Sequence, residues 1–471
     1  MSDLLNSDLK VLNVGLESFT DDIKAAGGSA ANINWKPPAK GDREVGLQLS
    51  DLINNPLVDQ ANEIAFSRYL GATPVLVGVG TVGEDLPDVG ERTLLHAGPP
   101  VSWESMCGPM QGGVIGAILY EGWAESEEKA RQLAASGEVT FDSCHHHNAV
   151  GPMAGLMSPS MPVWIVENTE HGNRAYSTLN EGLGKVLRYG AFNPDVISRL
   201  KLIENKLAPV LKEAVENGGR IDLKPFLAQA LHMGDECHNR NVAGSSLLVK
   251  KLMPPALRTG LSQEDVAEVV DYIADNDVFF LNISMAACKA MLDAAHNVPG
   301  SSMVTAMARN GVNFGMRVSG TGGQWFETPA PLVEGLYFPG YSIADAGADM
   351  GDSAITETAG LGGFAMAASL AIVLFIGGTP AQALAASREM RKITLGVNSA
   401  FTLPGLDFAA TAAGIDIRKV VDTSIQPVVN TGIAHKKAGV GQIGAGITEA
   451  PNECFTQAIS ALHKVVSKLD E

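Results

Sequence analysis

The segment PLVDQANEIAFSRYLG (residues 56–71) and the segment PVLVGVG (74–80) that follows it decide the expected fold of the N-terminal part of the chain. The first has the length and spacing of a helix, and the second is a short apolar run typical of a buried strand. The same alternation continues on both sides, with strand-like runs at 10–16, 30–35 and 93–98 and a helix-like run at 18–28. Strands separated by helices indicate a small parallel sheet of Rossmann-like character. We therefore expect an α/β fold whose first domain covers residues 1–105.

Two further regions follow this α/β pattern. The middle of the chain is dominated by helix-like runs, at 113–136, 197–218 and 262–276. The last third is rich in glycine and mixes strand-like runs at 311–320 and 426–436 with helix-like runs at 379–396 and 452–469. We expect a mainly helical domain over 106–300 and a glycine-rich mixed α/β domain over 301–471.

The charge and the cysteine content limit the class of protein. The formal net charge is −18, so nucleic acid and anionic membrane surfaces are disfavoured as partners. The N-terminus lacks the features of an export signal, and the longest apolar run, at 364–378, is too short to span a bilayer and indicates a buried helix. Five cysteines without a C-x-x-C pair fit reduced thiols. We expect a cytoplasmic protein.

Two glycine-rich stretches match G-x-G-x-x-G, at 78–83 and 439–444. Pro87 discourages the helix that a dinucleotide site needs after the first, and no buried strand precedes the second. Ordinary glycine turns are favoured, and we expect no cofactor. The amides of Gly441 and Gly444 in the second stretch could still cradle a phosphate.

The run CHHHN (144–148) contains residue types that bind zinc. Neighbours in an extended loop point to opposite sides, so at most two of these side chains face one site. The nearest second group, His232, Cys237 and His238, has no zinc spacing. We expect no metal site, and histidines that form hydrogen bonds in a loop are the simpler interpretation, although a metal-dependent amidohydrolase stays open.

The stretch LHMGDECHNRNVAGS (231–245) concentrates polar side chains in a short window. On a helix over 223–241, Cys237 falls on the apolar stripe, and the opposite stripe carries His232, Asp235, Glu236 and Asn239. His232 and Glu236 at spacing i, i+4 could touch and exchange a proton. A solvated helix face is the alternative, but this stripe contains no lysine. We predict a functional face.

The stretch MARNGVNFGMRVSG (307–320) places arginine and asparagine side chains among glycines. The guanidinium groups of Arg309 and Arg317 match carboxylate or phosphate, and the Asn310 amide can hold a carbonyl or amino group. Surface ion pairs are the alternative for either arginine. The chain has no G-x-S-x-G, H-E-x-x-H or Walker A pattern, so serine hydrolase, zincin and P-loop chemistry lack support.

Four strings together resemble the YahG/YlbE-like family of bacterial proteins: LHMGDECHNRN (231–241), MARNGVNFG (307–315), GDSAITETAG (351–360) and AHKKAGVGQIGAGI (434–447). The resemblance extends from about residue 10 to 465. Family members resemble the AllG-type subunit of oxamate carbamoyltransferase, which interconverts oxalurate plus phosphate with oxamate plus carbamoyl phosphate in allantoin breakdown. The resemblance also implies an FdrA-like subunit and a further carbamoyltransferase subunit as partners, in a homo- or hetero-oligomer.

The resemblance assigns no catalytic residues, and the S-T-R-T phosphate pattern of aspartate and ornithine carbamoyltransferases is missing. The roles therefore follow from chemistry, because carbamoyl transfer needs two anions held in register, a polarised carbonyl and a proton shuttle. We expect the following assignment: Arg309 and Arg317 for the small anionic substrates, Asn239 and Asn310 for the carbamoyl amide, Arg240 or His145 for the oxyanion, and His232 with Glu236 for the proton. The alternatives are the amidohydrolase and a noncatalytic scaffold subunit of the same complex.

Overall fold

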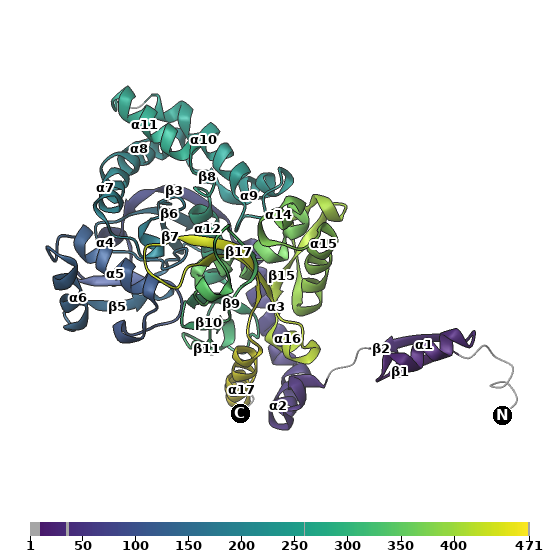
Figure 1. Cartoon of the computed structure of the whole chain (residues 1–471). Coiled ribbons are helices and arrows are strands. Elements are labelled where there is room, and N and C mark those ends of the chain that lie inside the picture. The colour runs from purple at the N-terminus through teal and green to yellow at the C-terminus, as the bar shows by residue number, and fades with distance from the viewer. Residues whose placement is uncertain (1–9, 34–36, 259, 470–471) are drawn as a thin grey trace, which may run out of the picture.

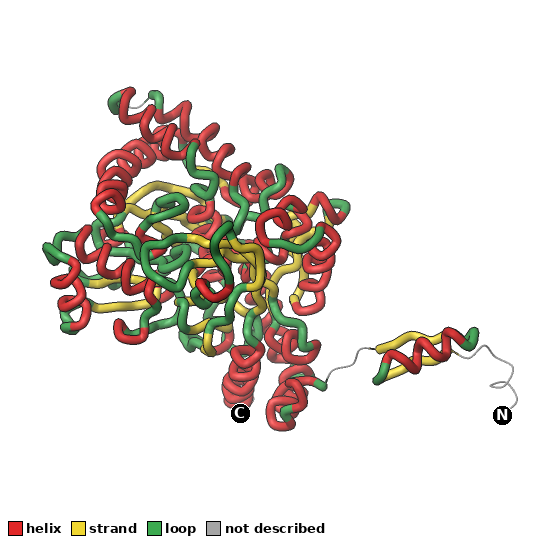
Figure 2. The backbone as a smooth tube through the Cα atoms, viewed as in Figure 1, coloured by secondary structure: helices red, strands yellow, loops and turns green. Residues whose placement is uncertain are grey.

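The computed structural model describes residues 10–33, 37–258 and 260–469, and it shows a mixed α/β protein with small parallel sheets near the N-terminus (Figure 1). This confirms the expected fold class. The tube view shows helices around several short sheets (Figure 2). The expected absence of an export signal concerns residues 1–9, which lie outside the described residues.

The first strands form the expected parallel unit. Strand β1 (Lys10–Val14) pairs in parallel with β2 (Ser29–Ile33), and α1 (Glu17–Ala25) connects them. Figure 1 shows this unit to one side of the rest of the chain. A second parallel pair joins β4 (Thr93–His96) to β5 (Thr140–Ser143), so strand pairing crosses the predicted limit at residue 105.

The strand that follows the opening helix belongs to an antiparallel sheet. Helix α3 (Pro56–Gly71) leads into β3 (Pro74–Thr81), which lies between β6 (Pro162–Asn168) and β8 (Ile221–Asp222) and pairs antiparallel with both. Strand β7 (Arg174–Thr178) completes the sheet. The predicted helix and strand are both present, but the parallel pairing expected for β3 is wrong because its partners come from the middle of the chain.

Helices surround these sheets and fill the middle of the chain. Helix α12 (Leu281–Ala294) is almost wholly buried against β6 and β7. The remaining helices described before α12 are α2 (Arg43–Ile53), α4 (Val82–Asp85), α5 (Gly108–Tyr120), α6 (Glu127–Ala135), α7 (Pro194–Leu202), α8 (Ala208–Gly218), α9 (Leu223–His232), α10 (Val242–Ala256) and α11 (Gln263–Ala274).

The C-terminal third contains three sheets. Strand β9 (Val304–Asn310) pairs with β10 (Asn313–Val318) and β13 (Met350–Gly351), and β11 (Phe326–Pro329) extends that sheet. The second sheet has the order β12 (Glu334–Tyr337), β17 (Gln442–Glu449), β16 (Val428–Ala434), and the third pairs β14 (Thr394–Leu403) with β15 (Ala409–Ile415). The helices here are α13 (Ile355–Thr358), α14 (Val373–Ile376), α15 (Pro380–Glu389), α16 (Ile417–Thr423) and α17 (Asn452–Leu469).

Two predicted helices differ from the structure. The helix expected over 223–241 ends at His232, because Gly234 (φ 100°) and Cys237 (φ 66°) adopt positive φ values that end a right-handed helix. The apolar run 364–378 breaks into short helical turns, and Leu374 is 82% exposed. Across the described ranges no single helix is both long and apolar enough to cross a membrane; one bent pair, Leu370–Ile376 with Pro380–Ile393, passes by length and composition alone.

A buried ion pair joins two sheets of the C-terminal third. Arg309 on β9 donates from Nε and Nη2 to the two carboxylate oxygens of Asp349, at 2.6 and 3.0 Å. Further bonds run from the same guanidinium to the Gly351 carbonyl and to the Thr431 hydroxyl on β16. Because both charges are fully buried, each depends on the other for compensation.

We expect the substitution Asp349→Ala to lower the free energy of unfolding by about 3–5 kcal/mol, since it leaves the buried Arg309 charge without a partner. Urea denaturation followed by circular dichroism measures the change. Glu138→Ala is the matched control; it breaks the exposed pair with Arg92 (2.8 Å) and should change stability by less than about 1 kcal/mol. Equal losses in the two variants would contradict this interpretation.

Candidate functional site

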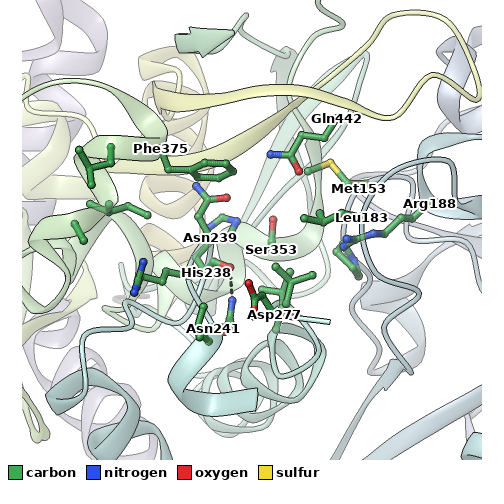
Figure 3. A pocket seen from close by; sticks show the side chains of 18 of the residues that line it. Met153, Leu183, Arg188, His238, Asn239, Asn241, Asp277, Ser353, Phe375 and Gln442 are labelled. Carbon is green, nitrogen blue, oxygen red and sulfur yellow. Dashed lines mark hydrogen bonds between the residues drawn. The ribbon is translucent and has the colours of Figure 1, made fainter. Parts of the chain in front are cut away.

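A pocket of about 380 Å³ lies where several segments between residues 152 and 442 meet (Figure 3). Its walls come from the loop before α7, the loop between α9 and α10, the start of α12, the turn before α13, the α14 region and the start of β17. Polar and charged side chains in its lining include Arg188, His238, Asn239, Arg240, Asn241 and Ser353. Apolar side chains, among them Met153, Leu281 and Phe375, form much of the remaining wall. This size and mixed lining are typical of a small-molecule site.

Unpartnered polar atoms concentrate in this pocket. Buried atoms on five lining residues have no hydrogen-bond partner in the described part of the chain: Arg188 Nε, Asn239 Nδ2, Arg240 Nε, Asn241 Oδ1 and Ser353 Oγ. Buried polar groups are normally hydrogen-bonded, so such a cluster indicates a place for a polar ligand. A larger groove of about 990 Å³ beside β12 and α15 has none of these atoms among its described lining residues.

The imidazole of His238 is held by a buried carboxylate. His238 is 3% exposed, and its Nδ1 lies 2.8 and 3.0 Å from the two carboxylate oxygens of Glu357. Glu357 is fixed in turn by the Gly363 amide and the Thr356 hydroxyl. Within the described residues the second ring nitrogen, Nε2, has no partner. A carboxylate that orients an imidazole in this way is the usual arrangement of a general acid–base pair.

The loop that carries His238 folds around its own carboxylate. Glu236 accepts the backbone amides of His238 (3.1 Å) and Arg240 (2.5 Å), and the Asn241 side chain donates to the His238 carbonyl at 2.6 Å (Figure 3). Asp235 accepts the Gly244 amide and thereby caps α10. These contacts replace the helix that the sequence pattern predicts, and they turn 238–241 toward the pocket.

Burial perturbs both acidic groups of this loop. It raises the pKa of Glu236 to about 7, although the neighbouring His238 and the Arg240 amide act in the opposite direction. It also raises the pKa of Asp235 to about 6, against the bond from the Gly244 amide. Groups with strongly shifted pKa values beside a pocket are typical of functional sites.

Arg188 gives the pocket a buried positive charge. Its side chain is 5% exposed, donates from Nη2 to the Gly182 carbonyl and lies over the Tyr189 ring. Arg188 forms no direct ion pair in the described ranges, although its charge acts on the buried carboxylate of Glu181 and opposes the rise in pKa that burial causes there. A buried guanidinium without a direct ion pair favours an anionic ligand. Arg240, whose Nε is 4.0 Å from Asp235, adds a second cation at the pocket.

The structure separates the two groups predicted to exchange a proton. His232 is exposed at the end of α9, where it bonds to the Thr402 hydroxyl (2.7 Å) and packs edge-on against Phe408. Glu236 is buried on the loop and bonds to amides, so the predicted contact between them is not present. Cys237 is buried in the core, as the sequence pattern indicated, but from a loop position.

Three residues of the stretch 307–320 were predicted to bind substrate, and two of them, Arg309 and Asn310, have a structural role. The guanidinium of Arg309 already donates to both carboxylate oxygens of Asp349, so it is not free to bind a substrate anion. Asn310 bonds to the Pro99 carbonyl and to the amides of Val312 and Asn313, which fixes the turn between β9 and β10. Arg317 lies elsewhere, beside His296 and Trp325, and His145 is close to the same tryptophan.

The predicted phosphate cradle in the second glycine stretch is not formed. Gly444 lies inside β17, paired with β12 and β16, where an added Cβ would lie 2.3 Å from the Leu336 carbonyl oxygen. Gly441 packs against the backbone of Gly184 and accepts the His435 amide. These glycines permit close backbone packing.

The residues considered for a metal do not converge. His146 and His147 bind Asp142, and His238 binds Glu357. Within the described ranges no group of three or more His, Cys, Asp or Glu side chains could hold a metal ion.

Sequence reasoning identified part of this pocket and missed the rest. Asn239 and Arg240 were predicted and line it. His238 lies in the polar stretch 231–245 and Ser353 and Glu357 lie in the stretch 351–360, but their roles depend on contacts between distant segments. Arg188 carried no signal, since a single arginine in GKVLRYG resembles any surface cation.

We expect stability to depend on pH through Glu236. The folded protein holds this proton up to about pH 7, whereas the unfolded chain releases it near 4.5, so the folded state loses relative stability as pH rises through that interval. The variant Glu236→Gln cannot ionise. Its melting temperature relative to that of the original protein should therefore be higher at about pH 8 than at about pH 5. A difference that does not change with pH would contradict the assignment.

Comparison with known proteins identifies the relatives of the chain. The family model for oxamate carbamoyltransferase subunit AllG matches residues 139–353, a range that includes Arg188, His238 and Ser353. The uncharacterized protein YahG of Escherichia coli K12 is 48% identical over 459 residues, 97% of each chain. Oxamate carbamoyltransferase subunit AllG of the same organism is 48% identical over 408 residues, 86% of this chain and 97% of its own.

A solved structure supports the same relationship. The crystal structure of a conserved protein of unknown function from Enterococcus faecalis V583 superposes with a TM-score of 0.86 at 50% identity, and the match covers 87% of this chain and 98% of the other. Sequence and fold agree over most of the chain. The chain therefore belongs to the family that contains YahG and the oxamate carbamoyltransferase subunit AllG.

Proposed function

We propose that this chain is a subunit of a cytoplasmic carbamoyltransferase complex, and that its pocket interconverts oxalurate plus phosphate with oxamate plus carbamoyl phosphate. The observation that carries the proposal is the buried Arg188, which has no direct ion pair among the described residues, in a pocket that also contains unpartnered side-chain amides and an oriented histidine. The 48% identity to an oxamate carbamoyltransferase subunit supports the substrate class.

The polar groups of the pocket fit an anion that carries a ureido group. A carboxylate needs a positive partner, which Arg188 supplies. The ureido carbonyl and N–H groups need hydrogen-bond donors and acceptors, which the side chains of Asn239, Asn241 and Ser353 can supply. Arg240 is placed to stabilise negative charge on the carbonyl oxygen that is under attack.

The transfer needs no covalent enzyme intermediate. A phosphate oxygen attacks the terminal carbamoyl carbon of oxalurate, and the bond from that carbon to the internal nitrogen breaks. The proton of hydrogenphosphate must reach the departing nitrogen. His238 Nε2 accepts this proton from hydrogenphosphate and donates it to the departing nitrogen of oxalurate. Glu357 meanwhile holds the ring through Nδ1. Oxamate and carbamoyl phosphate leave with all atoms and charges balanced.

The partners proposed for the complex are an FdrA-like subunit and a further carbamoyltransferase subunit. Two leucines at the pocket mouth support coverage by another chain, since Leu183 is 52% and Leu374 82% exposed. A noncatalytic scaffold role predicts that pocket variants keep the activity of the assembled complex, which the substitutions below test.

We expect His238→Asn to lower turnover in the assembled complex by a factor of about 10²–10⁴, the usual contribution of a general acid–base group. The assay follows carbamoyl phosphate formed from oxalurate and phosphate. His171→Ala, in the exposed turn between β6 and β7, is the control and should keep full activity. His232→Ala separates the two histidine assignments; if it abolishes turnover while folded His238→Asn keeps it, the present assignment is wrong.

Arg188→Gln should raise the KM for oxalurate about tenfold or more, because it removes a charged hydrogen-bond donor from the carboxylate. Steady-state kinetics of the assembled complex give kcat and KM separately. The exposed Arg220, which pairs with Glu167, provides the control Arg220→Gln. An unchanged KM in Arg188→Gln would show that the substrate carboxylate binds elsewhere.

A further inference from the structure

A second polar cluster lies outside the pocket, around Arg317 on β10. Arg317 Nη2 is 2.9 Å from His296 Nε2, and its guanidinium lies 5.7 Å from the centroid of the Trp325 ring. His145 packs edge-on against the same ring, at 5.4 Å between centroids. Two consecutive residues connect the cluster to the pocket. Ser353 lines the pocket, and the carboxylate of Asp352 lies 3.5 Å from His145 in the cluster.

Arg317 forms no direct ion pair in the described structure. The carboxylate of Asp293 acts on it and raises its pKa against the lowering by burial, but this carboxylate lies 2.6 Å from the buried Lys289. His296 cannot compensate the charge, since its other nitrogen bonds to Thr305 and burial, together with Arg317, lowers its pKa to about 3. The Nε atom of Arg317 is buried and also lacks a partner within the described ranges. A partly buried guanidinium in this state favours an added anion.

His145 is the second unsatisfied group of the cluster. It is 2% exposed, and neither ring nitrogen has a well-formed hydrogen bond with any described residue; Nε2 lies 3.5 Å from Oδ1 of Asp352, whose charge raises the pKa of the ring against the larger lowering by burial. The oxygen of Asp352 closest to it already accepts the Gly98 amide. A neutral imidazole always has one donor and one acceptor nitrogen, so a buried ring of this kind needs a partner that can serve at least one of them.

Trp325 covers the cluster from the solvent side. Its indole N–H donates to His146 Nε2 at 2.9 Å, and His146 is exposed. The tryptophan follows Gly322 (φ 64°) and Gly323, and an added Cβ at Gly323 would lie 3.8 Å from Arg317 Nη2. This hydrogen bond and the ring contacts with Arg317 and His145 together hold Trp325 in place.

We propose that Arg317 and His145 bind one small oxyanion that also carries a hydrogen-bond donor, hydrogenphosphate, beneath Trp325. Its charged oxygens accept from the guanidinium, and its O–H or another oxygen serves the imidazole in either tautomer. This site is separate from the pocket of the proposed function. In this site Arg317 and His145 bind an anion, as the sequence pattern suggested. Their neighbouring residues differ from those that the pattern suggested.

The test is a titration of the full-length protein with inorganic phosphate at constant ionic strength, followed by tryptophan fluorescence. We expect a saturable change that is absent in Trp325→Phe, because Trp325 covers the site. In Arg317→Gln the apparent Kd should rise about tenfold or more, since a charged donor is lost. Arg131→Gln, in an exposed pair with Glu127, is the matched control and should behave like the original protein.

The outcomes separate this proposal from the catalytic one. Arg188→Gln should keep the Trp325 signal even where it impairs turnover, because it changes only the pocket. The proposal is overturned by an unresponsive original protein, by a response that persists in Trp325→Phe, or by an unchanged Kd in Arg317→Gln. If Arg317→Gln does not fold, Arg317→Lys takes its place and should weaken binding by a smaller factor, since it keeps the charge and loses the fork.

Discussion

The fully buried carboxylate of Glu357 fixes the histidine loop of the pocket against the C-terminal third of the chain. It accepts hydrogen bonds from the His238 ring and from the Gly363 amide, and a longer one from the Asn430 amide on β16. An added Cβ at Gly362 would lie 2.2 Å from its Oε1, so only glycine allows the chain to pass so close. The loop 235–241, the turn after α13 and β16 converge on this group because a buried charge must be surrounded by donors.

Three buried or partly buried arginines differ in how well neighbouring groups compensate their charge. This difference distinguishes a structural arginine from one that can bind a ligand. Arg309 has a carboxylate and two further acceptors, so its environment is complete without a ligand. Arg188 and Arg317 form no direct ion pair among the described residues and interact with the carboxylates of Glu181 and Asp293 only through space, although burial makes their charges costly. The chemical type of the side chain is the same in all three. What distinguishes them is the set of neighbours, and that set points to ligands for the latter two.

The apolar wall of the pocket complements its polar floor. Leu374 and Phe375 belong to a run that resembles a buried helix in the sequence but forms the rim of the pocket in the structure. Gly377 and Gly378, both with positive φ, end the short helix α14 immediately after these residues. Exposed apolar side chains at the mouth are consistent with a chain that works within a complex.

The sequence by itself determined the individual elements and the family. The helix at 56–71 and the strand after it are where their patterns placed them, since periodicity and apolar runs are local properties. Four quoted strings were enough for the family, and comparison over most of the chain agrees. Asn239 was predicted to lie on a functional face because short polar groups without lysine are unusual on a solvated face, and Arg240 was predicted from the chemistry of carbamoyl transfer; both line the pocket.

Only the tertiary structure decided which groups meet. The helical wheel paired His232 with Glu236, but positive φ at Gly234 and Cys237 ends the helix and separates them. The pairs that do form, His238 with Glu357 and Arg309 with Asp349, span 119 and 40 residues. Such pairs are selected by the need to satisfy buried charges in the packed interior, a condition that local sequence patterns do not encode.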